Sequence, residues 1–215
     1  MTVRTLPYDW DIAIRHLRER DKRLARLMDR CPPDRMTLSR PATVFPALAQ
    51  AIVYQQLSGA AAATIFGRVR AIYAPKKFPT PDELAATPPA RLRAAGLSNA
   101  KTAAMIDLAM RTASGELPTM ATIRKLSDDE VVERLTVVRG IGPWTVHMFL
   151  IFRLGRPDVL PVADYGVRKG FALTYRRKEL PTVDELTRHA ARWRPYRSLA
   201  SWYMWRALEN QDQPR

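Results

Sequence analysis

The sequence predicts an all-α fold, and three observations support that class. Most of the 215 residues lie in runs whose apolar side chains recur at the spacing of one helix face. Two of these runs begin with the capping-box pattern that marks a helix N-terminus, Ser127 with Glu130 and Thr182 with Glu185. Almost no stretch alternates apolar and polar residues as a half-buried strand does, and no fixed-period repeat is present.

The expected helices follow one another along the chain, with proline-rich segments between several of them. The first covers 9–30 and carries a discontinuous apolar stripe that includes Leu17 and Leu24, before Pro32 and Pro33 end it. The others are expected over residues 43–58, 59–73, 81–86, 89–95, 101–113, 122–126, 127–138, 143–154, 165–175, 182–190 and 199–210. We group them into a single domain of two lobes, the middle one over about 43–126 and the other over about 1–42 plus 127–215.

The charge of the chain indicates a polyanionic partner. A net charge of +14 and an estimated pI of 10.6 suit DNA, RNA or an anionic membrane, although a generally basic proteome would give the same balance. The N-terminus lacks the apolar core of a signal peptide, and no stretch approaches the roughly 18 unbroken apolar residues of a membrane span. We therefore expect a soluble, cytoplasmic monomer with no membrane partner.

Cysteine usage excludes two kinds of site. Cys31 is the only cysteine in the sequence, so the chain can form no internal disulfide. It also cannot supply the four thiolates of a cysteine-ligated iron–sulfur cluster, or a cysteine-based zinc site.

A glycine turn at residues 139–142 organises the C-terminal half of the sequence. It reads Arg139-Gly140-Ile141-Gly142 and stands between two apolar runs. Both glycines can adopt positive φ and, lacking Cβ, let another backbone approach their amides. Pro143 suits the first turn of the following helix, whose unpaired N–H groups can bind an anion such as a DNA phosphate. Taken alone, the pattern also fits an ordinary tight turn.

The stretch from 127 to 169 resembles the helix-hairpin-helix motif of the base-excision DNA glycosylases, and is most similar to their 3-methyladenine DNA glycosylase II group. The residues that carry the resemblance are Leu135, Gly140, Ile141, Gly142, Trp144, Thr145, Leu160, Pro161, Asp164, Arg168 and Lys169. It extends over about 42–206. The resemblance implies a two-lobed helical enzyme with a cleft beside the hairpin. It also implies double-stranded DNA containing alkylated bases as the partner, and a bacterial nucleoid as the place of action.

Asp164 is the candidate catalytic residue. Cleaving an N-glycosidic bond builds positive charge on the sugar, and a carboxylate beneath that charge lowers the barrier. By position just before a helix, Asp164 would also be a plain N-cap. The resemblance implies that this Asp does both.

Trp144 indicates the subclass. It lies 164 − 144 = 20 residues before Asp164, where superfamily members that also cut the backbone carry a nucleophilic Lys. Trp offers no such amine, and neither Lys101 nor Lys169 matches that position. The resemblance therefore implies a monofunctional enzyme that releases the base and leaves an abasic site.

The resemblance also assigns the base pocket and the DNA contacts. It places Trp144, Trp205, Gln55 and Met148 at the pocket, where electron-rich rings would hold a positively charged alkylpurine; aromatic side chains at helical spacing are also ordinary core residues. The DNA-binding set is Arg139, Gly140, Ile141, Gly142, Thr145, Ser98, Asn99, Lys101 and Arg168.

Two further expectations come from the resemblance. The loop at 96–101 would push a side chain into the DNA stack where the damaged base has been flipped out, with Asn99 the first choice and Ser98 or Leu97 next; a plain helix cap fits that loop equally well. No cofactor is required, but a monovalent cation such as Na⁺ or K⁺ is expected on the carbonyls of Thr136, Val138 and Ile141.

Two other functions remain open from the sequence. Glycine hairpins of this type also occur in DNA-binding proteins with no chemistry, and a glycosylase could act on mismatched or oxidised bases instead of alkylated purines.

Overall fold

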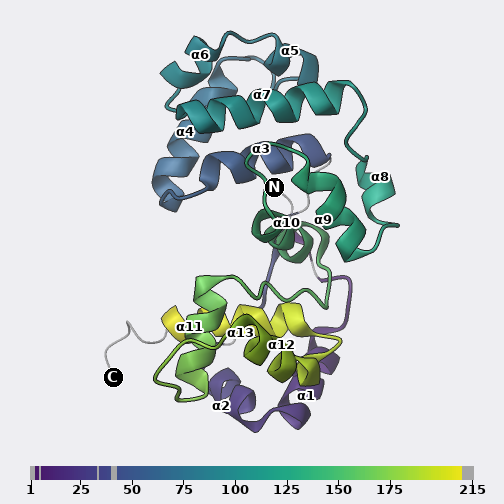
Figure 1. Cartoon of the computed structure of the whole chain (residues 1–215), viewed down its shortest axis with the longest axis vertical. Coiled ribbons are helices and arrows are strands. Elements are labelled where there is room, and N and C mark those ends of the chain that lie inside the picture. The colour runs from purple at the N-terminus through teal and green to yellow at the C-terminus, as the bar shows by residue number, and fades with distance from the viewer. Residues whose placement is uncertain (1–2, 5, 33, 40–42, 210–215) are drawn as a thin grey trace. The chain divides into compact units, whose positions relative to one another are not determined.

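The computed structural model describes residues 3–4, 6–32, 34–39 and 43–209, and its regular structure is nearly all helix (Figure 1). The predicted all-α class is confirmed. The chain forms two compact units, one of Pro41–Phe149 and one of Met1–Arg40 with Leu150–Arg215. Within the described residues, no helix combines the length and the apolar character needed to cross a membrane.

The unit Pro41–Phe149 is built around α7. Its helices are α3 (Val44–Tyr54), α4 (Gly59–Ala71), α5 (Pro81–Ala85), α6 (Pro89–Ala94), α7 (Asn99–Ala113), α8 (Met120–Ile123), α9 (Asp128–Thr136) and α10 (Pro143–Phe149). α3, α5 and α6 pack against α7, and α10 packs against α3 and α9. α9 and α10, which the sequence analysis grouped with residues 127–215, thus lie in this unit.

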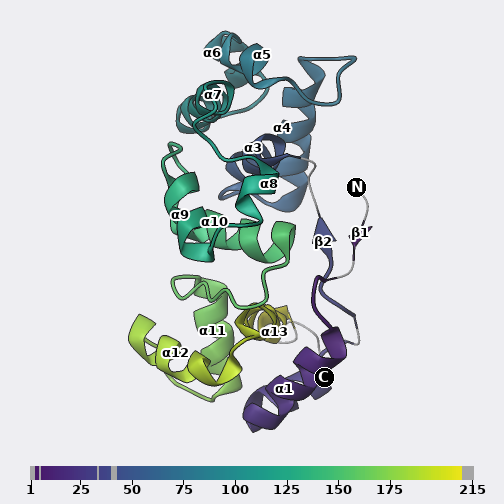
Figure 2. The ribbon, with the colours of Figure 1, turned by 90° about the vertical axis from the view of Figure 1, so that its right-hand side faces the viewer.

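The second unit combines both ends of the chain. It contains β1 (Val3–Arg4), α1 (Trp10–Arg20), α2 (Lys22–Arg30), β2 (Leu38–Ser39), a π-helix at Leu150–Leu154, α11 (Tyr165–Thr174), α12 (Val183–Ala190), a 3-10 turn at Ala191–Trp193 and α13 (Arg197–Glu209). β1 and β2 pair antiparallel, with Val3 opposite Ser39 (Figure 2). The sequence analysis did not predict them, because two residues are too few to show an alternating pattern.

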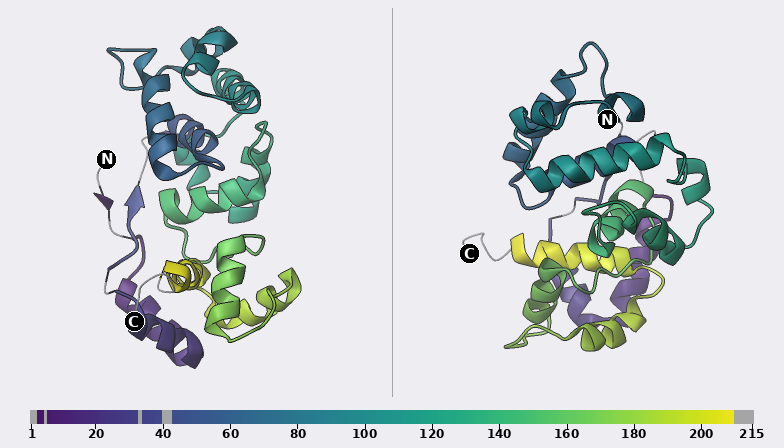
Figure 3. Two further views of the ribbon diagram at one scale, coloured as in Figure 1. Left: turned by 90° about the vertical axis from the view of Figure 1, so that its left-hand side faces the viewer. Right: turned by 45° about the horizontal axis from the view of Figure 1, so that its top comes forward.

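The closest helix packing in this unit joins α11 to α13, which lie side by side in green and yellow in Figure 3. Gly170 makes it possible. A Cβ at that position would overlap the carbonyl oxygen of Met204 and lie 2.9 Å from its Cα. Val167 and Phe171 on α11 and Leu199 and Met204 on α13 are buried in the core beside this contact.

The predicted helix over 9–30 is wrong as a single helix, because Asp21 interrupts it. Asp21 has an extended conformation, with φ −145° and ψ 98°, and ends α1 while it caps α2. Its carboxylate accepts hydrogen bonds from the backbone of Leu24 (3.1 Å) and from Trp193 Nε1 (3.0 Å). It is also bonded to His189 Nε2 at 3.0 Å and accepts from the hydroxyl of Tyr175. The break therefore ties α1 and α2 to α11, α12 and the 3-10 turn.

We expect Asp21→Asn to destabilise the protein by about 2–3 kcal/mol at neutral pH. Burial alone would raise the pKa of Asp21, but hydrogen bonds from His189, Tyr175, Trp193 and Leu24 outweigh it and hold the pKa well below its ordinary value. A depressed folded-state pKa contributes stability above the unfolded-state pKa of about 3.9, and that stability is lost as the pH falls.

Urea unfolding of both proteins between pH 7 and pH 3 measures this effect. The difference between them should shrink toward the acid end. Asp29→Asn is the matched control, because Asp29 pairs with Arg18 on the surface, and it should change stability by under about 1 kcal/mol. A pH-independent difference for Asp21→Asn would contradict the electrostatic account.

Several other boundaries differ from the sequence expectations. α7 begins at Asn99 rather than 101, α8 covers Met120–Ile123 rather than 122–126, and α9 ends at Thr136 rather than 138. α3 ends at Tyr54 rather than Ser58, because Gln56 has φ +55°, which no α-helix accommodates. The run expected over 143–154 changes from α-helix to π-helix at Leu150. The last helix begins at Arg197 and not at Leu199.

Candidate functional site

The hairpin at 137–142 lies between α9 and α10 and has one left-handed residue. Gly140 has φ +75°, and a Cβ there would contact the Cβ of Ala104 on α7 at 3.4 Å. Gly142, which could also adopt positive φ, does not do so. A Cβ at Gly142 would meet nothing within 4 Å, so this position is open to a close approach by another backbone.

Two side chains of the same unit form hydrogen bonds with the backbone of the hairpin. The backbone N–H of Arg139 donates to Asp107 Oδ2 at 2.8 Å, and that carboxylate is also bonded to Arg111. The amide of Gln55 donates from Nε2 to the carbonyl of Gly140 (2.9 Å) and to Thr145 Oγ1 (3.3 Å). The amide predicted for the base pocket is therefore hydrogen-bonded to the hairpin itself.

The loop that enters α7 carries three of the predicted DNA contacts. Ser98 is the N-cap of α7, its hydroxyl accepting from the N–H of Lys101 at 3.2 Å, and Asn99 is exposed. Leu97 is buried, which leaves Asn99 and Ser98 as the accessible side chains of this loop. Lys101 Nζ donates to the carbonyls of Val53 and Gln55, both at 2.7 Å.

The turn between α3 and α4 presents a residue that the sequence analysis did not select. Leu57 is 39% exposed, and it follows Gln56, whose φ of +55° is rare for a residue other than glycine. The sequence did carry a signal that could have selected Leu57, namely an apolar residue between the polar Gln56 and Ser58 at a break between two helices. Backbone strain of this kind occurs most often at functional sites.

Asp164 lies in the other unit and is the N-cap of α11. Its Oδ1 accepts from the backbone N–H of Val167 at 2.7 Å and from Trp205 Nε1 on α13 at 2.8 Å. The residue is 9% exposed. The predicted N-cap role is confirmed, and the indole donor is an addition that the sequence analysis did not foresee.

Gly166 allows the indole to reach that carboxylate. A Cβ at Gly166 would lie 2.7 Å from Trp205 Cδ1, so the indole would have to shift, and it would make a tight 3.1 Å contact with Asp164 Oδ1. Phe152 packs against the same indole, with its ring centroid 5.6 Å from that of Trp205. The sequence therefore fixes one oxygen of Asp164 through two N–H donors and a glycine.

The remaining predicted residues are distributed over both units. On α10, Trp144 is 44% exposed, Met148 is half-buried and Thr145 is buried. Arg168 on α11 is half-buried and donates from Nε to the carbonyl of Pro181 at 3.0 Å.

The expected cation ligands lie where α9 ends. Thr136 is the last residue of α9, and the carbonyl of Val138 accepts the N–H of Ile141 at 3.0 Å. Across the described ranges, no group of three or more His, Cys, Asp or Glu side chains could hold a metal ion.

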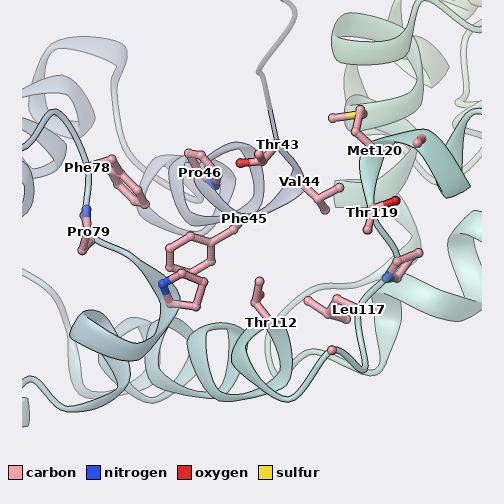
Figure 4. A pocket seen from close by; sticks show the side chains of 14 residues that line it. Thr43, Val44, Phe45, Pro46, Phe78, Pro79, Thr112, Leu117, Thr119 and Met120 are labelled. Carbon is pink, nitrogen blue, oxygen red and sulfur yellow. The ribbon is translucent and has the colours of Figure 1, made fainter.

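An apolar pocket of about 710 Å³ lies in the unit Pro41–Phe149, between the start of α3, the end of α7 and α8 (Figure 4). Phe45, Phe78 and Leu117 are among the residues that line it. None of the predicted site residues does, so the pocket is separate from the chemistry proposed for this chain.

Known proteins match the chain in sequence and in structure. Residues 49–195 match the family described as "HhH-GPD superfamily base excision DNA repair protein". The DNA-3-methyladenine glycosylase 1 of Schizosaccharomyces pombe is 36% identical over 203 residues, which cover 94% of this chain and 88% of that protein.

Two solved structures have the same fold. The S. pombe 3-methyladenine DNA glycosylase in complex with abasic DNA has a TM-score of 0.81 at 35% identity, over 95% of this chain and 100% of that one. A DNA-3-methyladenine glycosidase from Bacillus halodurans has a TM-score of 0.78 at 30% identity, over 96% of this chain and 92% of that one.

Proposed function

Because this chain belongs to the HhH-GPD superfamily of base excision DNA repair proteins, we propose that it is a monofunctional DNA-3-methyladenine glycosylase. Its substrate is double-stranded DNA that contains alkylated purines, and its products are the free base and an abasic site. The observation that carries the proposal is the carboxylate of Asp164, oriented by Trp205 and the start of α11. The enzyme acts where the cell keeps its DNA, and a bacterial nucleoid is the location we favour.

Asp164 stabilises the positive charge that develops on the sugar. As the bond from C1′ to the base nitrogen breaks, its electron pair leaves with the base and the sugar becomes oxocarbenium-like. A carboxylate close to that charge lowers the barrier, and one whose Oδ1 is already held by two N–H donors needs no reorganisation. Water then bonds to C1′ and loses its proton, so no cofactor is consumed.

Trp144 favours a monofunctional enzyme with an aromatic base pocket. An indole has no amine to form a covalent link with the sugar, so the sugar–phosphate strand stays intact. An alkylated purine such as 3-methyladenine or 7-methylguanine carries positive charge, and a tryptophan face attracts a cation by about 1–2 kcal/mol. With 44% of its surface exposed, Trp144 can offer such a face to a ligand.

The unit Pro41–Phe149, which carries the hairpin, binds the DNA while the damaged base is flipped out. The amides around Gly140 and Gly142 contact the phosphates, aided by the exposed Arg139, and this binding offsets the few kcal/mol of unstacking. Two side chains are candidates to fill the gap that the flipped base leaves in the DNA stack. Asn99 is the polar choice, and Leu57, being exposed and apolar, is better suited to unstacked bases.

We also propose a monovalent cation on the hairpin carbonyls. Thr136, Val138 and Ile141 supply hard oxygen donors where α9 ends, and the carbonyls at a helix C-terminus carry partial negative charge. The carbonyl of Val138 keeps a second lone pair beyond its bond to Ile141. A bound Na⁺ or K⁺ would stiffen the hairpin and attract phosphate, and the chemistry at Asp164 does not depend on it.

Incubating the protein with methylated duplex DNA tests the proposed function. We expect 3-methyladenine and 7-methylguanine in the supernatant, identified by mass, and strands that break only after alkali treatment. Tight, salt-sensitive binding without released base would instead identify a non-catalytic DNA-binding protein. Duplexes with one mismatched or oxidised base form the parallel panel, and release from these alone would move the substrate to that class.

A further inference from the structure

Two side chains connect three segments of the unit Pro41–Phe149 that the proposed function assigns to DNA binding. The segments are the turn at 55–58, the loop at 97–101 and the hairpin at 137–142. Lys101 Nζ reaches from α7 to the carbonyls of Val53 and Gln55, both at 2.7 Å. From the same turn, Gln55 Nε2 reaches the hairpin carbonyl of Gly140 at 2.9 Å. A continuous chain of hydrogen bonds thus runs from the α7 loop through the turn to the hairpin.

Lys101 occupies an unusual position for a lysine. Lysine head groups normally stay in water, whereas this one is partly buried, and burial lowers its pKa. The two carbonyls explain its retention there. Both lie at the C-terminal end of α3, where backbone carbonyls lack helical partners and carry partial negative charge. Two of the three N–H donors of the ammonium are therefore used inside the protein.

Gln56 shows why the turn needs support. Its φ of +55° costs a non-glycine residue on the order of 1 kcal/mol, and such a conformation persists only where neighbouring contacts hold it. The contacts next to it are those of Gln55, whose carbonyl is bonded to Lys101 and whose amide is bonded to the hairpin. The strained turn is thus fixed on one side by both bonds.

We propose that Lys101 and Gln55 are positioning residues that fix the three DNA-facing segments relative to one another, and that neither contacts DNA directly. The inference rests on the proposed function only in taking DNA as the partner. It replaces the sequence expectation that Lys101 binds DNA and that Gln55 lines the base pocket. A preformed platform avoids the ordering of three loops on binding, so the bridge acts on affinity. The chemistry belongs to Asp164 in the other unit.

A double-mutant cycle on DNA binding tests the bridge. Lys101→Met and Gln55→Met keep an unbranched side chain of similar length and remove the donors. We expect each single variant to bind an abasic-site duplex about tenfold more weakly than wild type. The double variant should bind as tightly as the weaker-binding of the two single variants, because either change breaks the same chain of hydrogen bonds. Base release at saturating enzyme should stay within about twofold of wild type, so that the loss appears in Kd and not in the chemical step.

Salt dependence distinguishes positioning from phosphate contact. The slope of log K against log salt is negative, and each lost phosphate contact makes it less steep by about 0.9. We expect the slope of Lys101→Met to equal that of wild type, whereas Arg139→Met, at an exposed hairpin position, should make it less steep by about that amount. Lys101→Arg adds a second test, because an arginine would restore a phosphate contact but its planar fork does not reproduce two point contacts to carbonyls.

The inference would be overturned by a slope less steep by about one unit in Lys101→Met, by full affinity in Lys101→Arg, or by additive losses in the double variant. Unchanged affinity in both single variants would overturn it as well. If a methionine variant does not fold, Lys101→Arg carries the test through its affinity and slope. Failure of the wild type to release any base would reject the proposed glycosylase while leaving these binding measurements valid.

Discussion

Replacing Asp164 with Asn should lower the rate of base release in a single turnover by about 10²–10³-fold, the usual effect of removing one electrostatic stabiliser. The variant loses the negative charge that, in the proposed mechanism, faces the developing sugar cation. It keeps an oxygen acceptor for the N–H groups of Val167 and Trp205, and Asn caps helices as well as Asp does. Stability should therefore stay near that of wild type, which separates the catalytic role from the capping role.

The measurement is single-turnover release from a duplex with one 7-methylguanine, at an enzyme concentration that saturates the DNA. Trp205→Phe is the matched variant, since it keeps an aromatic ring and removes the N–H donor to Asp164; its rate should fall about tenfold, between the other two proteins. A wild-type rate in Asp164→Asn, with the variant folded and bound, would remove this residue from the mechanism.

Gly170→Ala should have the largest effect on stability, a loss of about 3 kcal/mol or more that leaves little folded protein. The added methyl group would overlap the carbonyl oxygen of Met204, and this is backbone that no rotamer change can move. α11 and α13 would have to separate, and the buried side chains between them, Phe171 and Leu199 among them, would lose their contacts.

Circular dichroism during urea unfolding reports this change. Gly67→Ala is the control, because Gly67 lies within α4 and a Cβ there meets nothing within 4 Å. That variant should gain about 0.5–1 kcal/mol, the usual difference between alanine and glycine in a helix. A midpoint for Gly170→Ala equal to that of wild type would show that the two helices do not pack as closely as described.

The sequence predicted the parts of the fold that local signals specify. Ser127 and Thr182 each begin a helix with the expected capping box, and Asp164 caps the helix that follows it. Asp21 was missed because the apolar stripe runs through it, and its partners Tyr175, His189 and Trp193 lie more than 150 residues away in sequence.

The candidate site was likewise predictable only where a local sequence pattern marks it. The glycine turn and the acid carry a recognisable local pattern. The indole donor to Asp164 comes from 41 residues further along the chain, and the Lys101 bridge depends on where α3 ends. Neither leaves a signal in spacing or composition, because both arise when the helices pack.

The two roles of Asp164, the observed cap and the proposed catalytic one, affect how related sequences are judged. A carboxylate that closes the first turn of α11 is retained by selection for a folded protein, even in a descendant that has lost its activity. Its presence in an alignment is thus weak evidence for a working enzyme. The pair formed by Gly166 and Trp205 is the better diagnostic of an active enzyme. Gly166 leaves room for the indole that donates a hydrogen bond to Asp164, and helix capping alone requires neither residue.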